Sequence, residues 1–123
     1  METIWEPTHE SIERAHITRY VRWLERERGL RFADYAALWR WSVSDLKAFW
    51  ASIWDFFGVR ASAPYMTVLA KDTMPGAEWF PGAMLNYAEH ALARRDEHVA
   101  LISRSETRGL ERTTSLTYAE LAA

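Results

Sequence analysis

The sequence contains no cysteine among its 123 residues. A disulfide framework, a thiolate metal site and a cysteine nucleophile are therefore excluded. Proteins kept in a reducing compartment often lack disulfides, so we expect a cytoplasmic protein.

The sequence also lacks an excess of one charge and any long apolar run. With 15 basic residues against 17 acidic ones, the net charge of −2 creates no field that attracts nucleic acid or anionic lipid. The opening METIWEPTHESIERAH mixes acids and bases, unlike a signal peptide. No run of about 18 uncharged apolar residues occurs. We therefore expect neither nucleic acid nor a membrane as a partner.

Glycine is sparse and widely spaced. A nucleotide-phosphate loop needs glycines close together, because backbone amides must approach the phosphates without side-chain hindrance. None of the five glycines is nearer than six positions to another: Gly29, Gly58, Gly76, Gly82 and Gly109. We expect no phosphate cradle and no bound cofactor in these residues.

Residue patterns for catalysis or metal binding are also missing. Glu89 beside His90 is not a convincing acid–base pair, because adjacent helical residues point in different directions. The remaining candidates lack the spacing of a zinc site or of a G-x-S-x-G nucleophile elbow: His9, His16, His90, His98, Ser42, Ser44 and Ser52. We therefore predict no catalytic, cofactor-binding or metal-binding residue.

Aromatic residues are abundant, with seven Trp, five Tyr and five Phe. Such side chains bury large areas, so a wide aromatic core or interface is implied. The strongest helical stripe places six of the apolar residues on one face: Leu46, Phe49, Trp50, Ile53, Trp54 and Phe57. Lys47 is the only basic residue in this run, which favours core packing over insertion into a membrane surface. Gly58 is the expected C-terminal cap.

Two further helices are predicted before this stripe. The first follows Pro7 and Thr8 and ends at Gly29, and its apolar face carries Ile12, Ile17, Tyr20 and Leu24. On its other side we expect a solvated face rather than a phosphate-binding patch, formed by Arg19, Arg22 and Arg26 with Glu25 and Glu27. The second is capped by Asp34. Ser42 and Asp45 resemble a capping box before the aromatic stripe.

The segment MPGAEWFPGAMLNYAEHAL, residues 74–92, joins two Pro-Gly turns to a helix. Proline fixes φ and glycine permits the positive φ of tight turns, so Trp79 and Phe80 between the turns have few orientations available. We name residues 74–82 the strap and predict a rigid docking element; an ordinary loop packed on a core is the alternative. The helical pattern runs from Met84 to about Arg95, with Leu85, Ala88 and Leu92 on one face.

The remainder has the period of β-structure. A short extended piece is expected at residues 66–69, and residues 99–102 and 113–116 form a predicted hairpin with Gly109 in or near its turn. Thr117 and Glu120 form a second capping box. The helix that follows has about one turn before Ala123, too short to hold itself together in water. We therefore expect a fragment of marginal stability, with exposed apolar surface.

Three segments resemble a known family in the right order. DYAALWRWSVSDLKAFWASIWDFFGV, residues 34–59, resembles the aromatic helical region that precedes the catalytic core in adenylate-forming acyl-CoA synthetases. MPGAEWFPGAMLNYAEH, residues 74–90, resembles their acetoacetate branch by its second Pro-Gly. TSLTYAELAA, residues 114–123, resembles the start of their large adenylating domain. His90 and Leu46 depart from the branch, which often has asparagine and proline there.

The resemblance implies a mainly α chain, in which an aromatic-rich helical N-terminal cap over residues 1–96 precedes a β-hairpin. Residues 97–123 would then be the truncated start of the α/β AMP-binding domain. It also implies the N-terminal part of an ATP-dependent acetoacetate–CoA ligase, inactive by itself, whose catalytic motifs lie further C-terminal. Trp79 and Phe80 would be wedged against the large domain; direct contact with coenzyme A is the alternative.

The full-length parent would use ATP, Mg and coenzyme A with a small carboxylic acid substrate, and the partner of this region would be its own C-terminal adenylating domain. Within the family, the alternative is an acetyl- or propionyl-CoA synthetase. An alternative of another class is an aromatic-rich helical module that binds a partner protein through the stripe at residues 49–57 or through the strap.

Overall fold

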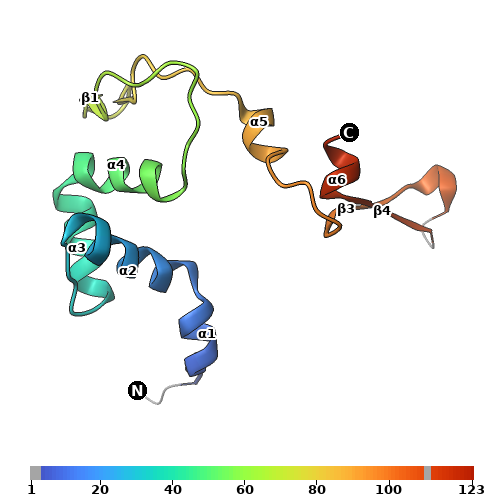
Figure 1. The fold of residues 1–123 in the computed structure, drawn as a ribbon, viewed down its shortest axis with the longest axis horizontal. Coiled ribbons are helices and arrows are strands. Elements are labelled where there is room, and N and C mark those ends of the chain that lie inside the picture. The colour runs from blue at the N-terminus through green and yellow to red at the C-terminus, as the bar shows by residue number, and fades with distance from the viewer. Residues whose placement is uncertain (1–3, 110–111) are drawn as a thin grey trace. The chain divides into compact units, whose positions relative to one another are not determined.

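The computed structural model describes residues 4–109 and 112–123. They form a mainly helical chain, as predicted, with two small pairs of antiparallel strands where one hairpin was expected (Figure 1). The chain divides into two compact units. We name residues 1–59 with 65–81 the helical unit, and residues 60–64 with 82–123 the hairpin unit. The predicted domain boundary after residue 96 stays a prediction.

The helical unit begins with two helices where one was predicted. Helix α1 spans His9–Arg14 and α2 spans His16–Arg28, because Ala15 between them is extended, with φ −64° and ψ 138°. The Thr18 hydroxyl donates to the Ile12 carbonyl at 2.6 Å, which occupies a carbonyl that a continuous helix would use. Gly29, with φ 68°, ends α2 as expected.

Helices α3, Tyr35–Ser44, and α4, Leu46–Phe56, follow with an aspartate cap each. Asp34 accepts from the Ala37 amide, which confirms its predicted role. The predicted capping box of Ser42 and Asp45 is wrong. Ser42 lies inside α3 and donates to the Trp39 carbonyl at 2.8 Å. Asp45 is itself the N-cap of α4, since its carboxylate accepts from the Ala48 amide and leaves no role for an upstream serine.

The end of α4 is closed by backbone hydrogen bonds around a left-handed glycine. Gly58 has φ 59°, and its amide donates to the Asp55 carbonyl at 3.1 Å. The Val59 amide donates to the Trp54 carbonyl at 3.0 Å. Together these bonds form a Schellman motif, which confirms the predicted role of Gly58.

The core of the helical unit lies between α2, α3 and α4. Its buried apolar residues are Tyr20, Leu24 and Leu38. Partly buried rings pack around them: Trp23, Phe32, Trp41, Phe49 and Phe56. Aromatic pairs prefer edge-to-face geometry because ring edges are positive and ring faces negative. The Tyr20 and Phe56 rings meet in this way, at 5.1 Å between centroids and 62° between planes.

A small antiparallel sheet completes the helical unit. Strand β1, Leu69–Lys71, pairs with β2, Glu78–Trp79. The extended piece predicted at residues 66–69 therefore lies about three positions too early. Met66 still contacts the strap, since its amide donates to the Pro81 carbonyl at 2.9 Å.

The hairpin unit starts with a helix much shorter than predicted. Helix α5 spans Tyr87–Ala91, capped by the Asn86 side chain, rather than running from Met84 to about Arg95. The backbone of Met84 pairs with residues 62 and 63 instead: its carbonyl accepts from the Ser62 amide, and its amide donates to the Ala63 carbonyl. A residue held in such an extended bridge cannot also begin a helix.

The predicted hairpin is confirmed. Strand β3, Val99–Arg104, pairs antiparallel with β4, Thr113–Thr117, and Leu101 lies opposite Leu116. The 3₁₀ helix η1, Glu106–Arg108, and Gly109 lie between the strands. Helix α6, Tyr118–Leu121, follows directly, and both hydrogen bonds of its predicted capping box are present. In the described part of the chain, no helix has the length and apolar character needed to cross a membrane.

Candidate functional site

Residues 74–81 of the strap belong to the helical unit, and their aromatic side chains pack on α4. The turns of the strap have the predicted glycine conformations, with φ 97° at Gly76 and 91° at Gly82. Phe80 also has a positive φ, 48°, and its amide donates to the Val68 carbonyl at 2.8 Å. Positive φ is unusual for a bulky residue and persists where surrounding contacts hold it.

Five aromatic rings take part in the contact between the strap and α4. The Trp79 ring centroid lies 5.6 Å from that of Trp50. The Phe80 ring lies 4.8 Å from Trp54, and Tyr65 closes the group at 5.1 Å from Trp54 and 5.2 Å from Phe80. The ring contacts of Trp79 and Phe80 leave the expectation that they wedge against the large domain a prediction, because these residues do not test a contact with that domain. These contacts are made with α4 and Tyr65 of their own unit.

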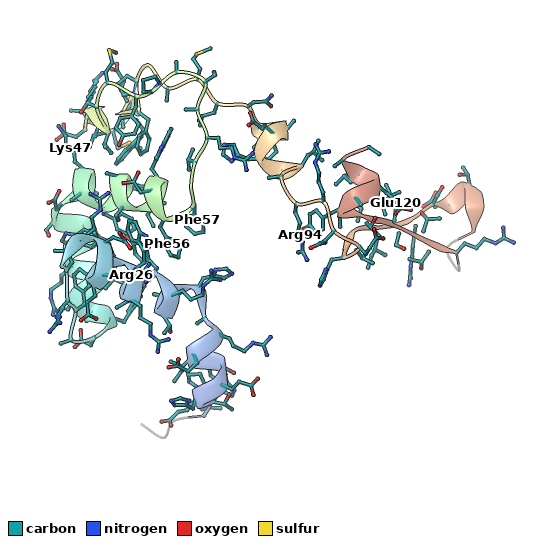
Figure 2. The ribbon with its side chains drawn as sticks, viewed as in Figure 1. Arg26, Lys47, Phe56, Phe57, Arg94 and Glu120 are labelled. Carbon is teal, nitrogen blue, oxygen red and sulfur yellow. The ribbon has the colours of Figure 1, made fainter. Side chains whose placement is uncertain are left out.

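The side chains of the predicted aromatic stripe on α4 pack against two different surfaces instead of one. Phe49 and Ile53 pack on the core, whereas Trp50 and Trp54 face the strap. Phe56, which is not part of the predicted stripe, packs on the core, and Phe57 stays 61% exposed (Figure 2). The prediction of one covered stripe is therefore wrong in detail, because α4 lies between two layers and uses two faces.

A buried hydroxyl pair joins α2 to α4. The Tyr20 and Ser52 hydroxyl oxygens lie 2.5 Å apart, and the Ser52 hydroxyl donates to the Phe49 carbonyl at 2.6 Å. The Tyr20 hydroxyl therefore donates to Ser52. Burial raises the pKa of Tyr20, and its hydrogen bond with Ser52 opposes that rise. Sequence analysis considered Ser52 only as a nucleophile and missed this pairing, since the two residues lie on different predicted helices.

An apolar groove lies on the core side of α4, within the helical unit. Its volume is about 260 Å³, and α2, α3 and α4 all contribute to its walls. Tyr35 is 68% exposed and Trp39 is 54% exposed, although both line it. We name this hollow the α3–α4 groove; its other lining residues include Ile17, Leu38, Phe49 and Phe57.

Two arginines on the predicted solvated face of α2, Arg22 and Arg26, pair with acids. Arg22 donates to both carboxylate oxygens of Glu13 at 2.7 Å, and this bond lowers the pKa of Glu13. Arg26 donates to Glu27 at 2.7 Å. These pairs fit the solvated face that the sequence predicts for this side of α2.

The histidines lie on different elements. His9 is in α1, His16 begins α2, His90 is in α5 and His98 precedes β3. The His90 ring nitrogen Nε2 lies within hydrogen-bonding distance of the Arg60 backbone. It is 2.9 Å from the carbonyl oxygen and 3.1 Å from the amide nitrogen. Within residues 4–109 and 112–123, no cluster of three or more His, Asp or Glu has the geometry for a metal ion.

A polar cluster, which we name the Asp96 clasp, joins the start of β3 to α6 in the hairpin unit. Arg94 Nε donates to Asp96 at 2.6 Å, and the His98 amide donates to the same carboxylate at 3.0 Å. The Arg94 guanidinium lies 4.6 Å from the centre of the Tyr118 ring. The hydrogen bond from Arg94 lowers the pKa of Asp96, and the bond from the His98 amide adds to this effect. The sequence does not predict the Asp96 clasp, because Arg94 and Tyr118 lie far apart along the chain.

Comparisons with known proteins show what this chain is similar to. The model described as "Acetyl-coenzyme A synthetase N-terminus" matches residues 35–91. The acetoacetyl-coenzyme A synthetase of Rhizobium meliloti is 36% identical over 90% of this chain and 17% of its own length. The acetoacetyl-CoA synthetase of Danio rerio is 36% identical over 98% of this chain and 18% of its own length.

A solved structure agrees with these relatives. The structure of acetoacetyl-CoA synthetase from Streptomyces lividans is similar with a TM-score of 0.84 and 45% identity, covering 98% of this chain and 19% of that one. The chain thus spans about 18% of the length of the curated relatives it matches. The chain is therefore similar along nearly its whole length to the N-terminal region of acetoacetyl-CoA synthetases, and residues 35–91 match the model of the acetyl-coenzyme A synthetase N-terminus.

Proposed function

We propose that this chain is the N-terminal part of an ATP-dependent acetoacetate–CoA ligase. The complete enzyme would convert acetoacetate, ATP and coenzyme A to acetoacetyl-CoA, AMP and pyrophosphate. The observation that carries the proposal is similarity along nearly the whole chain to proteins named acetoacetyl-CoA synthetases, at 36% identity over 98% of the chain for one of them.

Within that ligase, the chain would act as a structural cap and supply no catalytic group. The interactions of the helical unit support this role, since they consist of ring packing, helix caps and exposed ion pairs. ATP, Mg and the coenzyme A thiol would then be held by the remainder of the enzyme. The cytoplasmic location expected from the lack of cysteine stays a prediction.

The hairpin would form the first strands of the adenylating domain. Among the described residues, β3 and β4 pair only with each other. A two-stranded sheet is at best marginally stable in water, so each strand would gain stability from a further neighbour. The exposed side chains of Leu101 and Ile102, at 50% and 71%, fit a strand that a larger domain covers.

A second candidate within the family is an acetyl- or propionyl-CoA synthetase. The family model itself carries the name of acetyl-coenzyme A synthetase, which favours this alternative to a degree. The relatives named above favour the acetoacetate branch.

Exchange of this region between enzymes tests the proposal. The chain would replace the matching region of the Streptomyces lividans acetoacetyl-CoA synthetase and, in parallel, that of an acetyl-CoA synthetase. We expect acetoacetyl-CoA formation close to the parent's rate in the first host, and a lower rate of acetyl-CoA formation relative to its parent in the second. The chain alone should show no ATP–pyrophosphate exchange. A folded but inactive first chimera, or exchange activity in the chain alone, would contradict the proposal.

A further inference from the structure

We propose that the α3–α4 groove is the surface on which the helical unit docks the adenylating polypeptide of the complete ligase. This inference rests on the proposed function and deepens it by assigning the contact to one face. The strap, which the sequence suggested for this role, is then an internal brace of the helical unit.

The groove presents more aromatic surface than an isolated unit would leave in water. Tyr35, Trp39 and Phe57 line it and are 68%, 54% and 61% exposed. Single exposed apolar side chains are common, but a contiguous apolar patch marks an interaction surface. A second apolar hollow adjoins it, since Ile17, Tyr35 and Leu38 line both.

The strap face of α4 already carries ring contacts, although Trp50 and Trp79 stay 39% and 41% exposed. Trp50 and Trp54 make ring contacts with Trp79 and Phe80 there. These contacts hold both strap rings against α4, so docking through the strap would require them to leave an existing packing arrangement. The groove needs no such rearrangement, because its rings are exposed as they stand.

The occupant is inferred from chain length and from charge. The chain covers only 19% of the Streptomyces lividans structure, so a ligase of this family has about four times as much further polypeptide available to cover the groove. The groove walls carry no Asp, Glu, Lys or Arg. Its occupant must therefore present apolar side chains, and a segment of the same polypeptide pays a smaller entropic cost of association than a separate protein.

Hydroxyl-radical footprinting tests the assignment by measuring the oxidation rates of single side chains. The rates in the 123-residue chain would be compared with those in the Streptomyces lividans chimera. We expect Trp39 to be oxidised about fivefold more slowly in the chimera, because the core of an interface is almost fully buried. Trp79, on the strap face, is the matched control and should change by less than about twofold.

The outcomes separate the possible occupants. Protection of Trp79 without protection of Trp39 would move the docking surface to the strap and overturn the inference. Protection of Trp39 that appears in the chain alone as its concentration rises, with dimer mass in light scattering, would assign the groove to a second copy. Protection of Trp39 by octanoate in a chimera that otherwise leaves it exposed would assign the groove to a small apolar ligand. Both results overturn the inference.

Failure of the inference is distinguishable from failure of the proposed function. An active chimera with an unprotected Trp39 contradicts the docking surface and leaves the function standing. If the chimera does not fold, the chain is instead mixed with the separately expressed remainder of the relative. Slower oxidation of Trp39 in that mixture supports the groove, and an unchanged rate contradicts it.

Discussion

The helical unit and the hairpin unit are stabilised in different ways. All the buried residues found in the described parts of the chain lie in the helical unit, among them Leu24, Leu38 and Ser52. The hairpin unit instead depends on strand hydrogen bonds, two side-chain helix caps and the exposed Asp96 clasp. Among the described residues, a buried core is therefore found in the helical unit alone. Because burial of apolar surface is the main driving force of folding, we expect the helical unit to be the more stable of the two.

This difference fits the proposed role as the N-terminal part of a larger ligase. A unit with its own core can form early and keep its shape, whereas a hairpin with exposed apolar side chains gains its stability from the structure that covers it. The contrast therefore predicts that a substitution or a change of pH in one unit alters the stability of that unit and leaves the stability of the other unchanged.

The largest effect is expected from the centre of the helical core. Leu24 is 0% exposed, so Leu24→Ala should lower the free energy of unfolding of the helical unit by about 2–5 kcal/mol through lost burial and a cavity. Urea denaturation followed by tryptophan fluorescence measures it. The matched control, Leu101→Ala in the hairpin, removes a side chain that is 50% exposed and should cost less than about 0.5 kcal/mol. Equal losses would remove the distinction between the units.

The buried hydroxyl pair should give the next effect. Ser52→Ala leaves the Tyr20 hydroxyl without its acceptor, which should cost about 1–3 kcal/mol. Tyr20→Phe in the same background should recover part of that loss, since the unpaired hydroxyl is then gone. Chemical denaturation of the four variants in a double-mutant cycle measures the coupling. If the two costs simply add, the hydroxyl pair is not coupled as the geometry requires.

The strap contact should contribute less. Trp54→Ala and Phe80→Ala remove rings 4.8 Å apart, and their coupling should be about 0.5–1.5 kcal/mol. A control cycle pairs Trp54 with Tyr35, which lines the α3–α4 groove, and should give a coupling near zero. A coupling between Trp54 and Phe80 as small as the control would show that the strap does not pack on α4 in solution.

The smallest effect concerns pH and the hairpin unit. The pKa of Asp96 lies below its ordinary value of 3.8, so the contribution of the Asp96 clasp is present above that value. It is lost as pH falls through the lower pKa of the folded state. The Asp96 carbonyl also accepts from the Ala119 amide at 3.0 Å, so exchange of that amide reports on the clasp. We expect Asp96→Asn to speed this exchange at neutral pH.

The neighbouring variant Glu97→Gln is the control for the clasp and should leave exchange of the Ala119 amide unchanged. An NMR titration of the Asp96 carboxyl carbon gives its pKa directly. A pKa at or above 3.8 would contradict the role assigned to Arg94.

Local signals were sufficient for the features that depend on a few adjacent residues. Asp34, Gly29, Gly58 and the Thr117–Glu120 capping box take their predicted roles because their hydrogen bonds form within one turn of helix. The pairing of β3 with β4 was likewise readable from strands close together in sequence.

Predictions that depended on distant contacts were less accurate. Met84 forms an antiparallel bridge with Ala63, so α5 begins only at Tyr87. No local sequence pattern indicates that pairing. The two faces of α4 could not be separated, because periodicity shows which residues share a side but not how many layers they meet. The α3–α4 groove was missed for the same reason, since it forms only when three helices pack.

Amide hydrogen exchange of the 123-residue chain, read by mass spectrometry, tests the central contrast most directly. We predict slow exchange in α2 and α4, around the buried Leu24 and Ser52, and much faster exchange in β3 and β4, where only strand hydrogen bonds give protection. Protection of β3 and β4 equal to that of α2 would contradict the account, because the hairpin unit would then be stable without any covering structure.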